Sequence, residues 1–394
     1  MSSITGSLAT ALRHRLRPGM TIALGDGVGS LSLLDDGTAV GETLSAAARE
    51  VGGIRLVLGW LPVVPRGVDT TAFDEVVALM PGWGLRELLN QPTARFVPTR
   101  LTGIAALLGG PLRPDLLVTR LARRDGCLHF TTEVSWQRAV VDAGTTTLAI
   151  VDDSAPAASA EPIDSAALLV VAHAGDQPFR RTANDPEAVH LALAEEVLRW
   201  IPAGARVQYG PGQLGISLLQ RATVPLRVDT GMITDGVVDL DRRGLLIGQP
   251  TATYLLGGDE LYNWADGRDV LHGIEVTHDL TRLATGEPFV AVNTAIEIDR
   301  FGQVNAEGRG DKVVGGIGGH PDYCLAGHIN RGGLSIIAVP TSVNGRSPLV
   351  DRLSRPASTA AHDVDVVVTE NGSADLRCAS WSQREALISK LFDR

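Results

Sequence analysis

The chain has 394 residues, of which 44% are hydrophobic and 20% are charged, and its net charge is -10. This composition is typical of a soluble globular protein, and the length suggests two domains rather than a single core. An acidic chain lacks the basic patches that offset phosphate charge. We therefore expect neither nucleic acid nor an anionic membrane as a partner.

The three cysteines, Cys127, Cys324 and Cys378, lie far apart and show no CxxC or Cys/His spacing. The pattern indicates neither a disulfide framework nor a zinc site, and no metal is expected. The longest apolar run, near residues 166–172, is far shorter than the roughly 18–20 residues of a membrane span. The N-terminus also lacks the apolar core of a signal peptide, so we expect a cytoplasmic protein.

In chain order, the first half shows four short apolar runs without alternation. Such runs are typical of parallel strands that are covered by helices on both faces of a sheet. They predict strands over residues 21–24, 116–119, 147–151 and 168–171. A helical pattern over residues 41–51 completes the prediction of an α/β fold.

A polar segment with two prolines, residues 175–186, follows these elements. It predicts a division into an N-terminal domain, residues 1–180, and a C-terminal domain, residues 181–394. The Asn-Asp-Pro sequence that ends this segment is typical of a helix start, so we predict a helix over residues 186–200.

The start of the second half repeats a pattern of the first. Residues 17–27 align at a constant offset with residues 202–212. The matched glycines are Gly19, Gly25 and Gly27 in the first half and Gly204, Gly210 and Gly212 in the second. Any strand followed by a helix can give such a pattern, but we favour two related α/β halves.

Five motifs near the C-terminus occur in the order of a known family. They are Asn293-Thr-Ala-Ile-Glu-Ile-Asp299, Gly302-Gln-Val-Asn305, Gly315-Gly-Ile-Gly-Gly319 with Asp322-Tyr323, Gly332-Gly333, and Val367-Val-Thr-Glu-Asn-Gly-Ser-Ala-Asp-Leu-Arg377. Together they resemble the C-terminal half of the acetyl-CoA hydrolase / 4-hydroxybutyrate CoA-transferase family. Weaker resemblance extends into the first half, at residues 96–100 and 114–115.

The resemblance implies two similar open α/β lobes with mainly parallel sheets and an acyl-CoA thioester bound in the cleft between them. Coenzyme A, as the acyl-CoA substrate, is the only cofactor that it implies, and the family's self-association implies a homodimer. In the family, a glutamate attacks the thioester carbonyl to give an acyl-glutamyl anhydride. The CoA thiolate then returns to form an enzyme-bound thioester, which is covalent catalysis.

This chain departs from the family at the nucleophile. In place of a segment resembling His-Thr-Glu-Met-x-x-Asp-Gly it reads Asp229-Thr-Gly-Met-Ile-Thr-Asp-Gly236, so Gly231 stands where the glutamate is expected. If the segment is a strand, Asp229 points to the same face from roughly 6–7 Å away. It could act as a general base on a water in the space of the missing side chain. The alternative is that Asp229 and Asp235 are loop or capping residues.

The resemblance also implies that the glycine loop lies against the thioester, where its N–H groups can hold the carbonyl oxygen. The alternative is an ordinary flexible turn. The residues expected to bind substrate or CoA are Gly210, Gly212, Gly231, Met232, Asn305, Gly316, Gly318, Gly319 and Asp322.

Two further residues are candidates for catalysis. Glu297 alternates with isoleucines in a strand pattern and is the nearest alternative nucleophile, although a polar strand face that meets solvent gives the same pattern. His320 follows the glycine loop directly and is a candidate base near the acyl group. The alternative for His320 is a histidine with satisfied hydrogen bonds and no part in binding.

The end of the chain predicts architecture rather than catalysis. An apolar strand over residues 364–368 leads into Asn371-Gly372, a turn dipeptide, which we interpret as a strand-to-helix connection with Glu370 and Arg377 paired across it. A last helix is predicted over residues 382–391.

The leading functional hypothesis is an enzyme that uses water to cleave an acyl-CoA, either at the thioester or at the C–C bond of a β-keto acyl-CoA. One alternative keeps CoA transfer, with Asp229 or Glu297 forming the anhydride. A second alternative is a protein that binds acyl-CoA without turnover.

Overall fold

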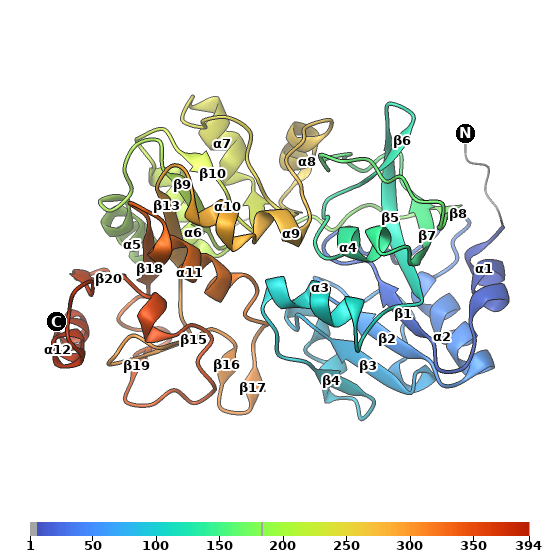
Figure 1. Ribbon diagram of the computed structural model, residues 1–394, viewed down its shortest axis with the longest axis horizontal. Coiled ribbons are helices and arrows are strands. Elements are labelled where there is room, and N and C mark those ends of the chain that lie inside the picture. The colour runs from blue at the N-terminus through green and yellow to red at the C-terminus, as the bar shows by residue number, and fades with distance from the viewer. Residues whose placement is uncertain (1–5, 183, 394) are drawn as a thin grey trace. The chain divides into compact units, whose positions relative to one another are not determined.

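The structure, a computed structural model, describes residues 6–182 and 184–393. The chain forms two compact units (Figure 1). The first unit runs up to Arg181 and takes in two later segments, Thr253–Leu255 and Tyr262–Glu275. The second unit holds the rest. The predicted division has a single boundary at residue 180 and does not place these two later segments in the first unit. Within the described residues, no helix has the length and apolar character needed to cross a membrane.

The first unit is built on an eight-stranded sheet with the spatial order β4-β3-β2-β1-β5-β7-β8, and β6 pairs with β5. Its strands are β1 (Thr21–Leu24), β2 (Arg55–Leu58), β3 (Glu75–Ala78), β4 (Ala94–Phe96), β5 (Leu116–Arg124), β6 (Cys127–Phe130), β7 (Thr146–Val151) and β8 (Leu168–His173). All pairs are parallel except β5 with β6. The four predicted strands are confirmed, and β5 continues to Arg124 because it pairs back with β6.

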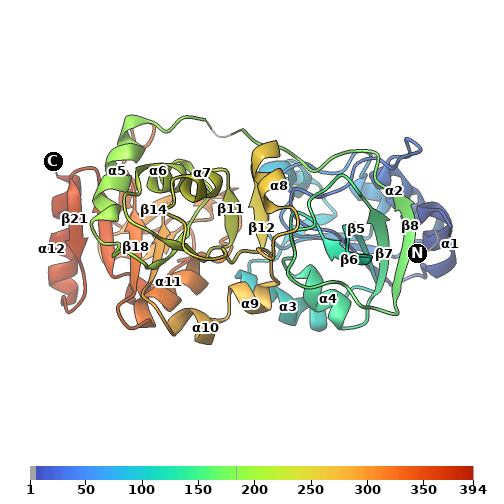
Figure 2. The same cartoon turned by 90° about the horizontal axis from the view of Figure 1, so that it is seen from above.

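Helices cover both faces of this sheet. They are α1 (Leu8–Arg15), α2 (Val40–Val51), α3 (Leu101–Gly109) and α4 (Gln137–Asp142), with short 3-10 turns η1 (Thr70–Ala72), η2 (Trp83–Leu85) and η3 (Leu88–Asn90). Figure 2 shows α3 and α4 on the face opposite to α2. Leu12 of α1 and Leu44 of α2 are fully buried against strand residues such as Ile22. This double cover explains why the strands are apolar without alternation.

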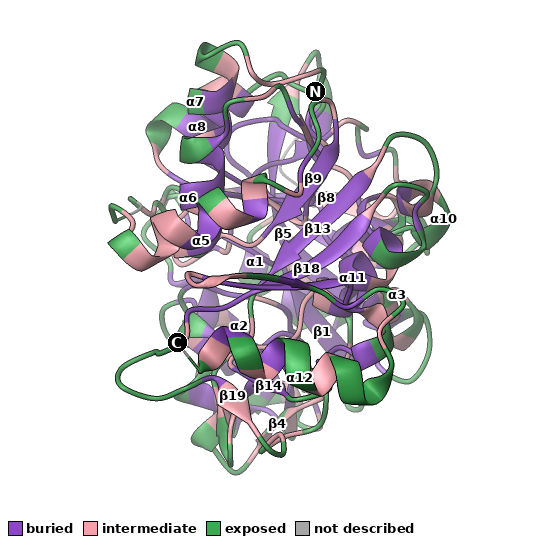
Figure 3. Cartoon of the chain, turned by 90° about the vertical axis from the view of Figure 1, so that its left-hand side faces the viewer, coloured by how far each residue is buried: buried purple, intermediate pink, exposed green. Residues whose placement is uncertain are grey.

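The second unit contains a six-stranded sheet with the order β10-β9-β13-β18-β20-β21. Its strands are β9 (Arg206–Tyr209), β10 (Arg227–Val228), β13 (Phe289–Asn293), β18 (Leu334–Ala338), β20 (Val366–Thr369) and β21 (Gly372–Asp375). All pairs are parallel except β20 with β21. Figure 3 shows β9, β13 and β18 buried along their length. Short strands outside this sheet are β11 (Met232–Thr234), β12 (Tyr254–Leu256), β14 (Glu297–Asp299), β15 (Val304–Asn305), β16 (Gly308–Arg309), β17 (Lys312–Val313) and β19 (Leu349–Val350).

The helices of this half of the chain are α5 (Ala188–Leu198), α6 (Gln213–Arg221), α7 (Gly236–Arg242), α8 (Asp259–Ala265), α9 (Ile274–Thr277), α10 (Leu280–Ala284), α11 (His320–Ile329) and α12 (Trp381–Phe392), with the 3-10 turn η4 (Ala361–Asp363). Figure 2 shows α5 and α6 on one face of the second sheet and α10 and α11 on the other. Both units are thus α/β layers around a mainly parallel sheet, which confirms the predicted fold class.

The predicted repeat coincides with matching elements. Strands β1 and β9 occupy aligned positions of the two repeats, and each is the first strand of its unit's sheet in chain order. Gly19 and Gly204, which precede them, both have a positive φ, 86° and 82°. Only glycine adopts this conformation without a steric cost. The repeat therefore marks the same turn into the first strand of each unit.

Two local predictions are wrong. The helix predicted from residue 186 begins at Ala188 and has Glu187 as its N-cap, so the proline stands before the helix. The turn at Asn371-Gly372 joins β20 to the antiparallel β21 instead of a helix, because Gly372, with a φ of 132°, turns the chain straight back onto β20. As a result Arg377 pairs with Asp375 at 2.7 Å rather than with Glu370.

Two carboxyl groups of the first unit are buried beyond the end of β1. Glu133 accepts hydrogen bonds from the N–H of Gly29 at 2.9 Å and from the hydroxyl of Thr132 at 2.7 Å. Asp26 accepts from Ser135 at 2.7 Å and from the hydroxyl of Tyr254. Burial raises the pKa of Asp26 to about 6 and that of Glu133 to about 7.

This burial makes the stability of the first unit depend on pH. The folded-state pKa of Glu133 lies above its ordinary value of 4.5, so the stability that its proton contributes is present at pH 4 and is lost as pH rises through 7. The variant Glu133→Gln cannot ionise, and we expect it to be about 3 kcal/mol more stable than the wild type at pH 8 and nearly equal at pH 4. Urea unfolding of the full chain at both pH values measures the difference.

The control for this prediction is Glu50→Gln, whose side chain is 63% exposed and whose pH dependence should match the wild type. If Glu133→Gln lost stability between pH 4 and pH 8 as steeply as the wild type, the buried carboxyl would not be the cause.

Candidate functional site

The carboxyl ends of the parallel strands in the second unit form one edge of its sheet. Strand β10 lies on one side of β9, whereas β13, β18 and β20 lie on the other, so the strand order reverses beside β9. Ligands of open α/β sheets bind outside the carboxyl ends of the strands at such a reversal. Gly210 and Gly212 follow β9 at this edge, Gly231 follows β10, and Thr294 follows β13.

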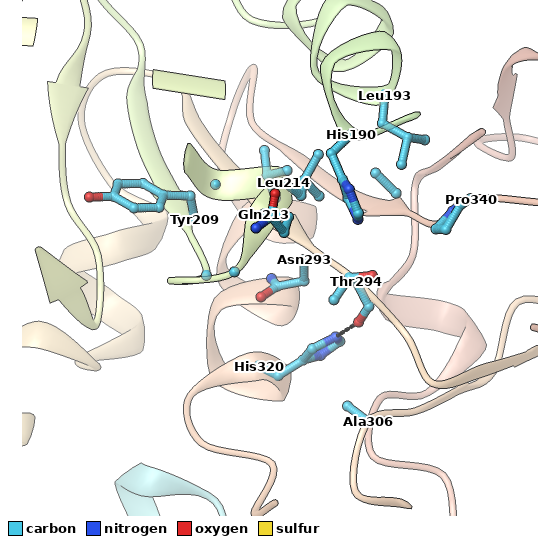
Figure 4. A pocket seen from close by; sticks show the side chains of 15 residues that line it. His190, Leu193, Tyr209, Gln213, Leu214, Asn293, Thr294, Ala306, His320 and Pro340 are labelled. Atoms are coloured by element: carbon cyan, nitrogen blue, oxygen red, sulfur yellow. Dashed lines mark hydrogen bonds between the residues drawn. The ribbon is translucent and has the colours of Figure 1, made fainter. Parts of the chain in front are cut away.

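A pocket of about 210 Å³ lies at this edge (Figure 4). Its lining includes Tyr209, Gly210, Gly212, Asn293, Thr294 and His320. A methyl group added at Gly210 or at Gly212 would meet no atom within 4 Å, so these glycines leave their backbone open to the pocket. Gly212 is also the N-cap of α6, whose first N–H groups point out of the helix end. The structure thus brings two of the predicted binding residues to one cavity.

His320 is the first residue of α11 and lines the same pocket. Its Nδ1 lies 2.7 Å from the hydroxyl of Thr359, and its Nε2 lies 3.0 Å from the carbonyl oxygen of Thr294 (Figure 4). Burial lowers the pKa of His320 to about 4, so the ring is neutral at pH 7. Because both ring nitrogens have partners, this geometry favours a role in joining α11 to the end of β13. The role of a base stays a prediction.

Gly231 is half-buried. A methyl group at this position would lie 3.6 Å from Cε2 and Oη of Tyr323 and 3.9 Å from Cε1 of His278, with no atom closer. These are ordinary van der Waals distances. The first atom of a side chain at position 231 would therefore fit without a clash. The rings of Tyr323 and His278 border that position.

His278 and Tyr323 are both buried, with 1% and 2% of their surface exposed, and their ring centres lie 4.6 Å apart. Among the residues that the structure describes, neither Nε2 of His278 nor Oη of Tyr323 has a hydrogen-bond partner. Burial, together with the Arg282 cation, lowers the pKa of His278 to about 3, and burial raises the pKa of Tyr323 well above its usual 10. Both groups are thus neutral at pH 7. The unsatisfied Oη of Tyr323 lies beside Gly231, and the unsatisfied Nε2 of His278 lies against Gly319.

The glycine loop ends against the same imidazole. Gly318 has a φ of 60°, which favours glycine, and Gly319 is buried. A methyl group at Gly319 would collide with Nε2 of His278 and would lie 2.8 Å from the ring of Tyr323. The histidine ring therefore requires a glycine at position 319. Gly316, from the same loop, is half-buried.

Asp229 is buried and held by two arginines. Its two carboxylate oxygens each accept a hydrogen bond from Arg282 at 2.8 Å, and Arg206 lies 3.4 Å from one of them. Arg206 also donates to the carbonyl oxygen of Leu283 at 2.8 Å. Such charge-assisted hydrogen bonds hold the carboxylate and the segments that carry the arginines in fixed positions. Its predicted role as a base is untested, and the contacts favour an anchoring role.

Glu297 is buried in β14, so the interpretation of a solvent-facing strand is wrong. Its carboxylate accepts from Asn305 at 2.8 Å and from the N–H and hydroxyl of Ser354 at 2.8 and 2.9 Å. Burial alone would raise the pKa of Glu297, but these hydrogen bonds and the nearby Arg309 outweigh it and lower the pKa. Asn305 also donates to the carbonyl oxygen of Gly308 at 2.8 Å. The contacts join β14 to β15, and the predicted ligand roles of both residues remain predictions.

The last two predicted residues flank these groups. Met232 is half-buried at the start of β11, and Asp322 is buried in the first turn of α11. Sequence reasoning did not select His278 or Tyr323 as site residues. No motif surrounds His278, and Tyr323 entered only as part of the glycine motif. Over residues 6–182 and 184–393, no three His, Cys, Asp or Glu side chains are arranged to hold a metal ion.

Comparison with known proteins finds a family match in the C-terminal part of the chain. The family model described as the acetyl-CoA hydrolase/transferase C-terminal domain matches residues 257–391. The 4-hydroxybutyrate coenzyme A transferase of Clostridium kluyveri is 28% identical over 219 residues, which cover 51% of this chain and 51% of that protein. The acetyl-CoA hydrolase of Kluyveromyces lactis is 28% identical over 201 residues, 47% of this chain and 37% of that protein. The chain thus spans about half the length, or less, of these curated relatives.

Solved structures show the same fold over nearly the whole chain. RipA from Yersinia pestis aligns with a TM-score of 0.86 and 18% identity, covering 97% of this chain and 93% of that one. The 4-hydroxybutyrate CoA-transferase of Porphyromonas gingivalis aligns with a TM-score of 0.76 and 19% identity, covering 98% of this chain and 93% of that one. The fold is therefore that of CoA-transferases. Residues 257–391 thus match the C-terminal domain of the acetyl-CoA hydrolase/transferase family, and the chain as a whole shares the fold of these solved structures.

Proposed function

We propose that this protein is an enzyme that cleaves an acyl-CoA with water, in place of the carboxylate nucleophile of its relatives. The observation that carries the proposal is the room for an added group at Gly231, bordered by the rings of His278 and Tyr323, each of which has an unsatisfied polar atom. A water in that space can reach an electrophilic carbon that a glutamate side chain would otherwise attack. The composition and the family resemblance lead us to propose a cytoplasmic homodimer.

The pocket at the sheet edge suits the part of the substrate next to the reacting carbon. A volume of about 210 Å³ is too small for a whole CoA, so we assign it the end of the pantetheine arm. Gly210 and Gly212 allow that arm to approach the backbone. The glycine loop, residues 315–319, and the N-terminus of α11 supply N–H groups for the carbonyl oxygen as negative charge develops on it.

The same contacts speak against CoA transfer through another carboxylate. A transferase carboxylate must attack the thioester and then leave the acyl group, which requires a free oxygen. Both oxygens of Asp229 are held by Arg282, and the carboxylate of Glu297 is held by Asn305 and Ser354. Breaking such buried pairs is costly, so neither group is suited to repeated covalent turnover.

The first prediction concerns the acceptor. The purified full-length protein should cleave at least one member of a panel of acetyl-, butyryl-, succinyl- and acetoacetyl-CoA without any added carboxylic acid, giving free CoA from a thioester or acetyl-CoA and acetate from the C–C bond of acetoacetyl-CoA. Water is then the only acceptor. A thiol reagent measures CoA, and chromatography of the acyl products tells thioester cleavage from C–C cleavage of the β-keto substrate. CoA exchange that strictly requires added acetate would contradict the proposal.

The second prediction restores the missing carboxylate. Gly231→Glu should reduce acceptor-free CoA release at least about tenfold, because the side chain displaces the water, and should introduce acetate-dependent CoA transfer. The contacts of an added methyl group are ordinary, so the longer side chain can start without a clash. Hydroxylamine trapping and peptide mass mapping should find the covalent adduct on the introduced carboxylate.

Gly231→Gln is the matched control, because glutamine has the same size and no nucleophilic oxygen. We expect this variant to lose acceptor-free CoA release and to gain no acetate-dependent CoA transfer. If both variants released CoA at the wild-type rate, position 231 would lie away from the reaction.

A further inference from the structure

Water-dependent cleavage needs a group that takes a proton from the water. We propose that His278 is this base and that Tyr323 is the hydrogen-bond donor that holds the water beside Gly231. The inference rests on the proposed function and deepens it by naming the residues of the reaction.

The geometry around Gly231 matches a single water. A water at the position of the missing methyl group would lie 3.6 Å from Oη of Tyr323. A shift of about 0.7 Å brings it to hydrogen-bond distance. The nearest imidazole atom, Cε1 of His278, is 3.9 Å from the same point, and Nε2 is bonded to it. A water placed between the two rings would give both unpartnered atoms a partner, which would remove the cost of leaving them buried.

The other side of the imidazole selects the tautomer that a base requires. Nδ1 of His278 lies 2.8 Å from the hydroxyl of Thr277. With the proton on Nδ1 donated to that hydroxyl, Nε2 carries a free lone pair that faces the water. The hydroxyl of Tyr323 stays protonated and donates to the water oxygen. Gly319 lets the ring approach this closely, because any side chain there would displace Nε2.

Thioester cleavage at this site balances in atoms and electrons. The water oxygen bonds to the carbonyl carbon while one water proton passes to Nε2 of His278, and the carbonyl π pair moves to oxygen. The pKa of His278, about 3 in the unliganded chain, rises in this step because negative charge develops on the carbonyl oxygen. The tetrahedral oxyanion then re-forms the carbonyl, the C–S bond breaks, and its electron pair leaves on sulfur. The sulfur takes the proton back from Nε2, so a carboxylic acid and CoA leave and the imidazole is neutral again.

The test compares two variants with matched controls, using the acyl-CoA that the wild type releases fastest. His278→Asn removes Nε2 and keeps a polar group for Thr277. We expect kcat to fall about 100-fold or more with KM changed less than threefold. Tyr323→Phe removes only the hydroxyl, and we expect a loss of about tenfold. His328→Asn and Tyr262→Phe make the same replacements elsewhere and should retain wild-type kcat.

A third variant covers the case in which His278→Asn does not fold. Gly231→Ala places a methyl group in the water position and makes only ordinary contacts, so it should fold and lose acceptor-free release as His278→Asn does. Gly109→Ala, where an added methyl group meets no atom within 4 Å, is its control.

The outcomes separate the two proposals. A wild type that cleaves no acyl-CoA of the panel without an acceptor would overturn the proposed function itself. A wild type that does, combined with a folded His278→Asn variant within threefold of its kcat, would overturn only the assignment of the base. If His278→Asn fails to fold, the Gly231→Ala variant decides the question. Acceptor-free cleavage by Gly231→Ala at the wild-type rate would overturn the assignment of the base.

Discussion

The site depends on one constraint, which is that buried polar atoms need hydrogen-bond partners. Leaving one unpaired costs about 1–3 kcal/mol, and here two of them belong to the adjacent rings of His278 and Tyr323, which border Gly231. A carboxylate at position 231 could accept from Tyr323, but it would repel the lone pair of His278 in the tautomer described above. A water both donates and accepts, so it satisfies both atoms. The glycine at position 231 and the unpaired atoms of His278 and Tyr323 are thus both explained by a water bound beside Gly231.

The ion pair of Asp229 fixes the parts that carry this arrangement. Arg282, in α10, binds both oxygens of Asp229, which directly follows β10. His278 precedes α10, and Gly231 lies two residues after Asp229, so the same pair positions the water site from both sides. Because separating a buried pair leaves uncompensated charges, the spacing between Gly231 and His278 is held firmly. This precision comes from a charge network that does not itself take part in the reaction.

The sequence predicted the layers well because parallel strands that are covered on both faces give continuous apolar runs. The strand over residues 21–24 is found with its predicted bounds. The turn at residues 371–372 was interpreted wrongly because a turn dipeptide is compatible with either a helix or a strand after it. A strand that can pair back onto its neighbour gains hydrogen bonds that a local pattern does not reveal.

The site was only partly predictable for a related reason. The glycines at positions 231 and 319 stood out in the sequence because of the family resemblance. His278 did not, since it meets Tyr323 only through the packing of α11 against the segment before α10, and the two are far apart in the chain. The arginine partners of Asp229 come from equally distant segments. Sequence patterns identify residue types, whereas these contacts depend on tertiary packing.

The most direct test of the account is a crystal structure, at a resolution that shows ordered water, with a non-hydrolysable acyl-CoA analogue bound. The account predicts one water within about 2.6–3.2 Å of both Nε2 of His278 and Oη of Tyr323, in line with the carbonyl carbon of the analogue. A dry or side-chain-filled space beside Gly231, or an acyl group bound away from it, would contradict the account.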